Sequence, residues 1–161
     1  MSSSYPDKNH NITISDEEEI SFETRSESYC VCIVDIVDST RITSRISDPK
    51  GIMRYYSIFL NSMAAIARGY GARIIKNVGD SLIYYFPETS DVSKWSGFKG
   101  VLESAITMIS AHKIINAKLS DEKLPLVDYR ISADYGRVEI AKSSSSMAED
   151  CSERQLICAP R

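Results

Sequence analysis

Two short stretches hold the carboxylates whose types and spacing could do chemistry. The stretch "KNVGDSLIYYF", which begins at Lys76, places Asp80 directly after Gly79, and "VDIVDST" places Asp35 and Asp38 where an apolar run ends. Two carboxylates brought together repel each other, and a pair of hard cations converts that repulsion into attraction. Magnesium prefers such oxygen ligands and keeps open positions for phosphate. The pattern therefore indicates a two-metal site for phosphate chemistry.

Each motif also has a simpler explanation. Asp35 and Asp38 suit hydrogen bonds within a turn, and Gly79 with Asp80 suits a tight hairpin, because glycine adopts positive φ without a clash. A lysine in a strand, such as Lys76, ordinarily points into solvent. Neither motif alone decides between the two explanations, and their combination favours the metal site.

The elements that must position these carboxylates follow from hydrophobic periodicity. An apolar, β-branched run over 29–36 predicts a short buried strand. An Asp-Pro pair opens residues 48–69, where apolar side chains recur at steps of three or four, so an amphipathic helix is expected there. Residues 72–78 and 81–86 predict two strands around the Gly-Asp turn.

The second half of the chain repeats this order. Residues 95–118 predict another helix, with His112 near its solvated end, and 127–133 with 137–141 predict a hairpin that turns near Tyr135-Gly136. The apolar stripe expected on this helix consists of Val101, Leu102, Ala105, Met108, Ile109 and Ile115. The order of elements predicts an α+β, ferredoxin-like split βαβ fold, in which the first strand lies centrally and ends near the turn between the next two.

Composition and length describe one soluble domain with two tails. The 161 residues are 43% hydrophobic and 25% charged. Residues 1–28 carry seven acidic against two basic side chains and are expected to be a disordered acidic tail. The domain is expected over 29–142, and 143–161 lose all periodicity and are expected to be irregular.

Charge and apolar runs narrow the possible partners and the compartment. A net charge of -3 offers no broad basic face, so no nucleic-acid partner is expected. No run approaches the roughly 20 apolar residues that cross a bilayer, and the start lacks the apolar core of a signal peptide, so we expect a cytoplasmic protein without membrane contact. Cys30 and Cys32 lie in an apolar run, and Cys151 and Cys158 do not complete a zinc pattern, so all four are expected to be reduced thiols.

Three segments together resemble the class III nucleotidyl cyclase domain, the family of adenylate and guanylate cyclases. They are "DIVDST" at 35–40, "KNVGDSLIYYF" at 76–86 and "YRISADYGRVEI" at 129–140, and the likeness covers about 29–150. The resemblance implies the ferredoxin-like cyclase fold. It also implies that Asp35 and Asp80 are the catalytic residues, which hold two Mg²⁺ or Mn²⁺ ions together with the backbone carbonyl of Ile36.

The resemblance assigns nucleotide contacts as well. In the family, the loop after the first aspartate wraps the triphosphate with backbone N–H groups, and that loop is formed here by Val37, Asp38, Ser39 and Thr40. Ser39 replaces the usual aromatic residue, and Asp38 stands where glycine is common. Lys76 matches the base-reading lysine of adenylate cyclases, whereas guanylate cyclases usually carry glutamate there, so ATP is the implied substrate rather than GTP.

The implied reaction is attack of the ribose 3'-hydroxyl on the α-phosphorus of ATP, which yields cyclic AMP and pyrophosphate. Family sites lie between two subunits, with the aspartates of one chain facing the lysine of the other. A homodimer, or pairing with another cyclase chain, is therefore implied. The alternative is a non-catalytic module that binds nucleotide or regulates another cyclase chain.

The C-terminal end departs from the family pattern. The family continues with D-x-x-G-x-x-V-N, whose aspartate helps to read the base, and Asp150 matches that aspartate. The following "CSERQLICAPR" does not match. One thymine restored after the Asp150 codon permits "LFGATVNLCAK" for these eleven residues, which has the expected spacing. The sequence thus favours a frameshifted tail and a cyclase fold that is incomplete at its C-terminal end.

Overall fold

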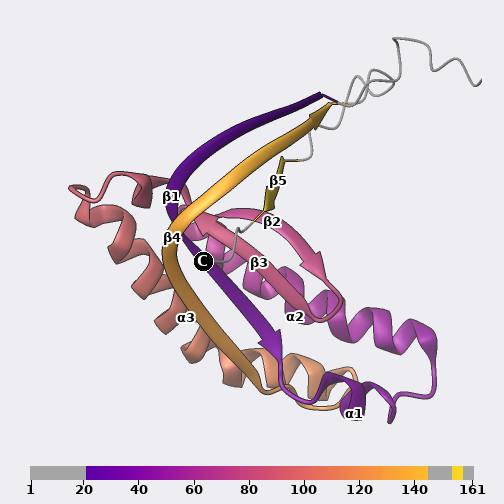
Figure 1. The fold of residues 1–161 in the computed structure, drawn as a ribbon. Helices are drawn as coiled ribbons and strands as arrows, with labels where there is room; N and C mark the ends of the chain where they lie inside the picture. Colours follow the sequence, from indigo (N-terminus) through magenta and orange to yellow (C-terminus); the bar gives the residue numbers. More distant parts are fainter. Residues whose placement is uncertain (1–20, 145–153, 158–161) are drawn as a thin grey trace, which may run out of the picture.

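One antiparallel sheet organises the chain. The computed structural model describes residues 21–144 and 154–157. The elements in chain order are β1 (Ser21–Ile36), α1 (Ser39–Thr43), α2 (Pro49–Gly69), β2 (Arg73–Val78), β3 (Ser81–Phe86), the 3-10 turn η2 (Pro87–Ser90), α3 (Trp95–Asp121), β4 (Tyr129–Ser144) and β5 (Arg154–Ile157). The five strands lie in the order β2-β3-β1-β4-β5 (Figure 1).

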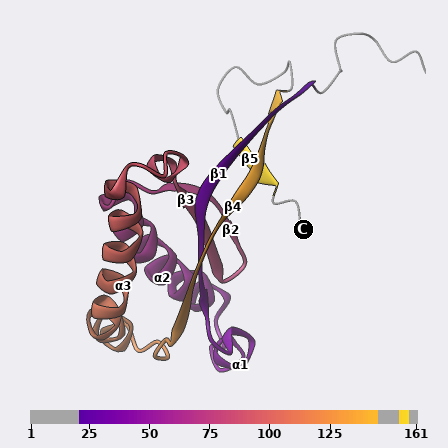
Figure 2. The ribbon, with the colours of Figure 1, turned by 60° about the vertical axis from the view of Figure 1, so that its left-hand side comes forward.

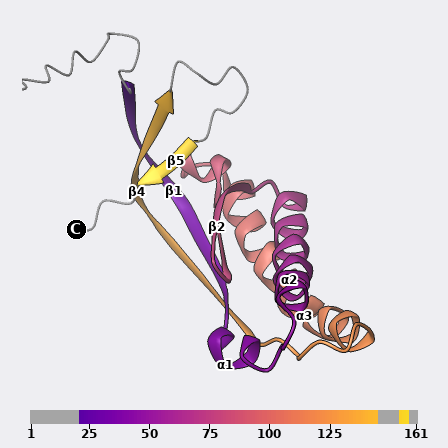
Figure 3. The ribbon, with the colours of Figure 1, turned by 90° about the vertical axis from the view of Figure 1, so that its right-hand side faces the viewer.

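This topology confirms the predicted α+β, ferredoxin-like fold. β1 lies between β3 and β4 and is antiparallel to both, and β2 pairs with β3. The helices α2 and α3 pack on the same side of the sheet, which Figures 2 and 3 show from two directions. In the described ranges the opposite face of the sheet has no covering helix. None of the described helices is both long and apolar enough to cross a membrane.

Alternation along β1 decides which side chains enter the core. Cys30, Cys32, Val34 and Ile36 are each at most 5% exposed and pack against α2 and α3. Because successive strand side chains point to opposite faces, Asp35 belongs to the helix-free face. The pattern of this one strand therefore places the predicted catalytic carboxylate away from the core.

Local turn and cap chemistry agrees with the sequence at two places. The Asp48 carboxylate caps α2 by accepting a hydrogen bond from the Lys50 N–H at 3.1 Å, and Pro49 opens the first turn. Gly79 has φ +59° in the turn between β2 and β3, a conformation that glycine adopts at little cost. Both the helix start and the hairpin are confirmed.

The hairpin predicted near Tyr135-Gly136 is wrong. β4 is one continuous strand, and Gly136 pairs with Tyr29 in its middle. β4 pairs with β1 along its whole length, from Ile36 with Tyr129 to Ser21 with Ser144. Pairing with the distant strand β1 gives the backbone N–H and C=O groups around Gly136 their hydrogen-bond partners without a turn. The preference of glycine for turns is a local signal and does not predict this pairing.

The same ladder changes both expected tails. Residues 21–28, expected in a disordered tail, belong to β1, and their backbone pairs with residues 137–144 of β4. Within the expected irregular segment 143–161, β4 continues to Ser144, and residues 154–157 form β5, which pairs with β4. Asp150 lies outside the described residues.

The buried side of α3 is narrower than its sequence stripe. Val101, Met108 and Ile115 are buried, but Leu102 and Ile109 are 55% and 65% exposed, so these two members of the expected stripe lie outside the core. Cys30 and Cys32 are buried free thiols, as expected. The pKa of the Cys32 thiol is raised by its hydrogen bond with Cys30 and by burial. Cys151 and Cys158 lie outside the described residues.

Gly97 allows α3 to approach η2, and we expect its replacement by alanine to be costly. A Cβ at Gly97 would lie 2.8 Å from the Glu88 carbonyl carbon and 2.9 Å from the Thr89 nitrogen, which are backbone atoms. Gly97→Ala should lower the free energy of unfolding by about 1–3 kcal/mol through overpacking. Urea denaturation measures this, and Gly69→Ala, with nothing within 4 Å, is the control. Equal midpoints for the two variants would contradict the packing.

Candidate active site at the end of the central strand

The register of the sheet brings Asp35 to the Gly79–Asp80 turn. Asp35 is the penultimate residue of β1 and pairs with Ser81 on β3 and with Arg130 on β4. Asp80 directly precedes Ser81, so it lies next to the cross-strand neighbour of Asp35. Two carboxylates far apart in sequence thus belong to the same corner of the sheet.

Arg130 supplies a cation at this corner that the sequence motifs do not predict. The guanidinium donates two hydrogen bonds to Oδ2 of Asp35, from Nη2 at 2.6 Å and from Nε at 3.2 Å. The pKa of Arg130 is raised by its hydrogen bond with Asp35, then by the Asp35 charge, with further contributions from the charges of Asp38 and Asp80. Three carboxylates therefore act electrostatically on one positive group.

This donor set fits a hard divalent cation. Carboxylate oxygens that already attract a guanidinium provide the negative field that Mg²⁺ and Mn²⁺ need. The side chain of Ile36 is 2% exposed in the core, so only its backbone carbonyl could join Asp35 and Asp80 as a ligand. No cluster of three or more His, Cys, Asp or Glu side chains suited to a metal occurs in the described part of the chain. Any metal here would rely on the carbonyl, water or substrate for its other ligands.

The loop after β1 is only partly free for phosphate. The Val37 N–H donates to the backbone carbonyl of Asp128 at 2.8 Å, so this amide is already used, contrary to the expectation that Val37 wraps the triphosphate. Ser39 and Thr40 open α1, and the first bond that closes its turn runs from the Ile42 N–H to the Asp38 carbonyl. The amides of Ser39 and Thr40 therefore have no carbonyl partner within α1.

Asp38 has a left-handed backbone, with φ 53° and ψ 35°. Asp and Asn tolerate this region better than other side chains, and glycine adopts it without steric cost. The conformation explains why a glycine suits this position of the loop. The Asp38 carboxylate itself is exposed and accepts a hydrogen bond from Arg41 Nη2 at 2.9 Å.

Replacing Asp38 should separate its backbone role from its charge. We expect Asp38→Gly to be more stable than Asp38→Ala by about 1 kcal/mol, because both lose the carboxylate and only alanine keeps a Cβ at positive φ. Urea denaturation of the two variants measures the difference. Equal unfolding midpoints would show that the loop does not hold the left-handed conformation in solution.

Lys76 lies apart from the carboxylates. It is exposed on the edge strand β2, where it pairs with Ile83, and Ile83 pairs with Ile33 on β1. Two strand spacings and two residues along β1 separate Lys76 from Asp35, which corresponds to about 12 Å. The lysine expected to read the base and the carboxylates expected to bind metal thus do not form one cluster within a chain.

Comparisons with known proteins identify the fold. No family model matches the sequence, and no curated protein matches it. Solved cyclase structures do match: the guanylyl cyclase Cya2 at 15% identity (TM-score 0.69; 83% of this chain, 64% of that chain), and the adenylyl cyclase CyaB from P. aeruginosa at 20% identity (TM-score 0.69; 84% and 67%). The guanylate cyclase domain of RhGC from Catenaria anguillulae, in complex with GTP, matches at 19% identity (TM-score 0.62; 83% and 68%).

The chain therefore has the fold of a nucleotidyl cyclase catalytic domain. The resemblance inferred from the sequence motifs is confirmed at the level of the fold. The chain spans about two thirds of the length of these cyclase structures, 64% of the first and 67% of the second.

Proposed function

We propose that this domain converts ATP to cyclic AMP and pyrophosphate at a site that contains Asp35, Asp80 and the Ile36 carbonyl. The observation that carries the proposal is the convergence of negative charge at the end of β1. Asp35 accepts hydrogen bonds from Arg130, and the charges of Asp38 and Asp80 act on the same guanidinium. The cyclase fold supports it.

The residues of the site suit phosphoryl chemistry without a covalent intermediate. When bound, two divalent cations would lower the pKa of the attacking ribose hydroxyl and neutralise charge on the phosphates. Asp35 and Asp80 would hold these ions, and the amides of Ser39 and Thr40 would donate to phosphate oxygens. Arg130, once separated from Asp35, would become a charge-assisted donor to the triphosphate. The carboxylate of Asp38 would weaken phosphate binding.

ATP and a second chain complete the proposal. Lys76 favours ATP over GTP as the substrate. The solved structures of similar fold include a rhodopsin-guanylyl cyclase with converted specificity in complex with ATPalphaS, as well as the GTP complex. The helix-free face carries Ile33 and Val78, which are 40% and 51% exposed and which a partner chain would cover. A homodimer, or a pair with another cyclase chain, would bring Lys76 of one chain to the carboxylates of the other.

The test is a turnover assay with the purified chain, Mn²⁺ and either ATP or GTP. The proposal predicts cyclic AMP and pyrophosphate in equal amounts, with a higher kcat/KM for ATP than for GTP. The other candidate, a module that binds nucleotide without turnover, predicts a rise in melting temperature with Mn²⁺ and nucleotide but no product. No stabilisation and no product would reject both.

A further inference from the structure

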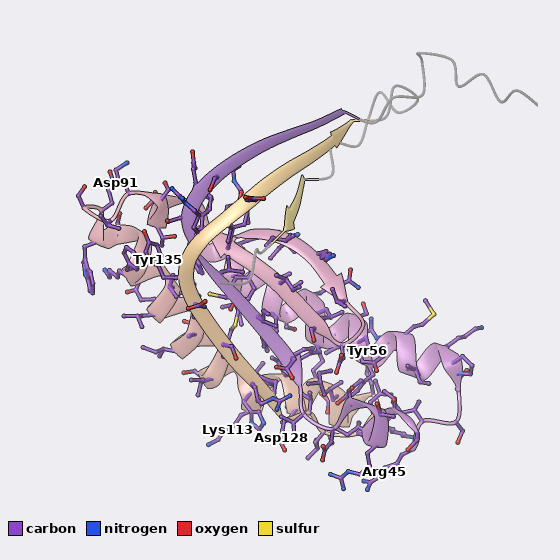
Figure 4. The ribbon with its side chains drawn as sticks, viewed as in Figure 1. Arg45, Tyr56, Asp91, Lys113, Asp128 and Tyr135 are labelled. Carbon is purple, nitrogen blue, oxygen red and sulfur yellow. The ribbon has the colours of Figure 1, made fainter. Side chains whose placement is uncertain are left out.

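The segment between α3 and β4 lies directly behind the proposed site. Residues 124–128 form no helix or strand, yet Val127 is fully buried. Figure 4 shows Asp128 at the start of β4, close to the end of β1. An irregular segment at this place needs specific partners for its backbone groups, because an unpaired buried N–H or C=O is costly.

Asn116 of α3 provides those partners. The Val127 N–H donates to Asn116 Oδ1 at 2.7 Å, and Asn116 Nδ2 donates to the Val127 carbonyl at 3.0 Å, so one side-chain amide satisfies both backbone groups as a neighbouring strand would. Asn116 is 9% exposed, and its Nδ2 also lies 3.1 Å from His112 Nε2. These bonds are shielded from water and therefore hold their geometry well.

The residues that follow Val127 lead straight to the site. The Asp128 carbonyl accepts the Val37 N–H, and its carboxylate Oδ1 lies 2.9 Å from His112 Nε2. The Tyr129 hydroxyl donates to the Met108 carbonyl at 2.5 Å. Arg130 then reaches Asp35. Four successive residues thus connect α3 with the end of β1.

We propose that Asn116 is a positioning residue for the site: through Val127 and Asp128 it fixes the backbone of Val37 and, with it, the entry to the 38–40 loop. His112 contributes a weaker contact through the Asp128 carboxylate. That side chain is 82% exposed, so its interaction with His112 is open to water. The role of Asn116 in the site rests on the proposed function. The hydrogen bonds that connect Asn116 with Val37 do not depend on that function.

The test measures amide hydrogen exchange at Val37 by NMR, together with the Kd of Mn²⁺ and a non-reacting ATP analogue. Asn116→Ala should accelerate amide exchange at Val37 about tenfold or more and leave the amides in the middle of β1 at wild-type rates. It should also raise the Kd of the ATP analogue. Asn116→Asp keeps an acceptor for the Val127 N–H but replaces the donor to the Val127 carbonyl by a second acceptor, so it should also accelerate exchange at Val37 and lower the affinity for the analogue. It replaces the alanine variant if that variant does not fold.

Ser104→Ala is the matched control. Ser104 is 1% exposed on the same helix and donates only within α3, to the Val101 carbonyl at 2.8 Å, so its loss should leave Val37 exchange and analogue binding unchanged. If the Asn116 variants and Ser104→Ala give the same Val37 exchange, the positioning role is overturned. If the wild-type chain does not bind the analogue, the proposed function fails, and Val37 exchange alone decides whether Asn116 holds the end of β1.

Discussion

Replacing Asp35 with asparagine should lower cyclase turnover by at least about 100 to 1,000-fold, a loss on the scale of one missing transition-state contact. Asparagine keeps the size of the side chain but removes the charge that would hold a divalent cation and that now pairs with Arg130. The side chain is partly exposed, outside the core, so the fold should remain intact.

The measurement is kcat with saturating Mn²⁺ and ATP, alongside the melting temperature. Asp121→Asn is the control, because this aspartate is the exposed last residue of α3, in the helix layer rather than at the end of β1, and its replacement should leave the rate unchanged. If Asp35→Asn and Asp121→Asn retain the same rate, Asp35 does not take part in the reaction.

Replacing Arg130 with glutamine should move two quantities in opposite directions. Without the guanidinium, Asp35 loses the cation that pairs with it, so Mn²⁺ should bind more tightly in the absence of nucleotide. Turnover of ATP should nevertheless fall about 100-fold, because a charge-assisted donor to the phosphates is lost.

Isothermal titration with Mn²⁺ and the cyclase assay measure the two effects on the same protein. Arg137→Gln is the control, since Arg137 lies on the same strand, is exposed and has Ser28 as its cross-strand partner rather than Asp35. If Arg130→Gln weakens Mn²⁺ binding, then Arg130 supports the metal site rather than competing with it.

Sequence patterns with local causes predicted the fold well. The cap at Asp48, the turn at Gly79 and the apolar strand that ends at Ile36 each follow from the chemistry of a few neighbouring residues. The order of elements then placed the end of β1 beside the Gly79–Asp80 turn, which the register confirms.

Features that depend on pairing between distant segments could not be predicted from the sequence. The turn expected at Gly136 does not form, because β1 extends far enough to pair with β4 along its full length. That same register places Arg130 opposite Asp35, and the contact is not visible until the partner strand is known. The Val37 amide is used by Asp128 for the same reason. The exposed Leu102 shows that an apolar stripe predicts which side of a helix faces the core, but not how many of its side chains are buried.

The most direct test of the shared carboxylate site is an Mn²⁺ titration followed by electron paramagnetic resonance, with a non-reacting ATP analogue present. The account predicts that Asp35→Asn and Asp80→Asn each weaken Mn²⁺ binding by about tenfold or more, and that the double variant loses less than the product of the two effects, since both side chains serve the same ions. Unchanged binding in Asp80→Asn, or two effects that multiply independently, would contradict a site shared by the two carboxylates.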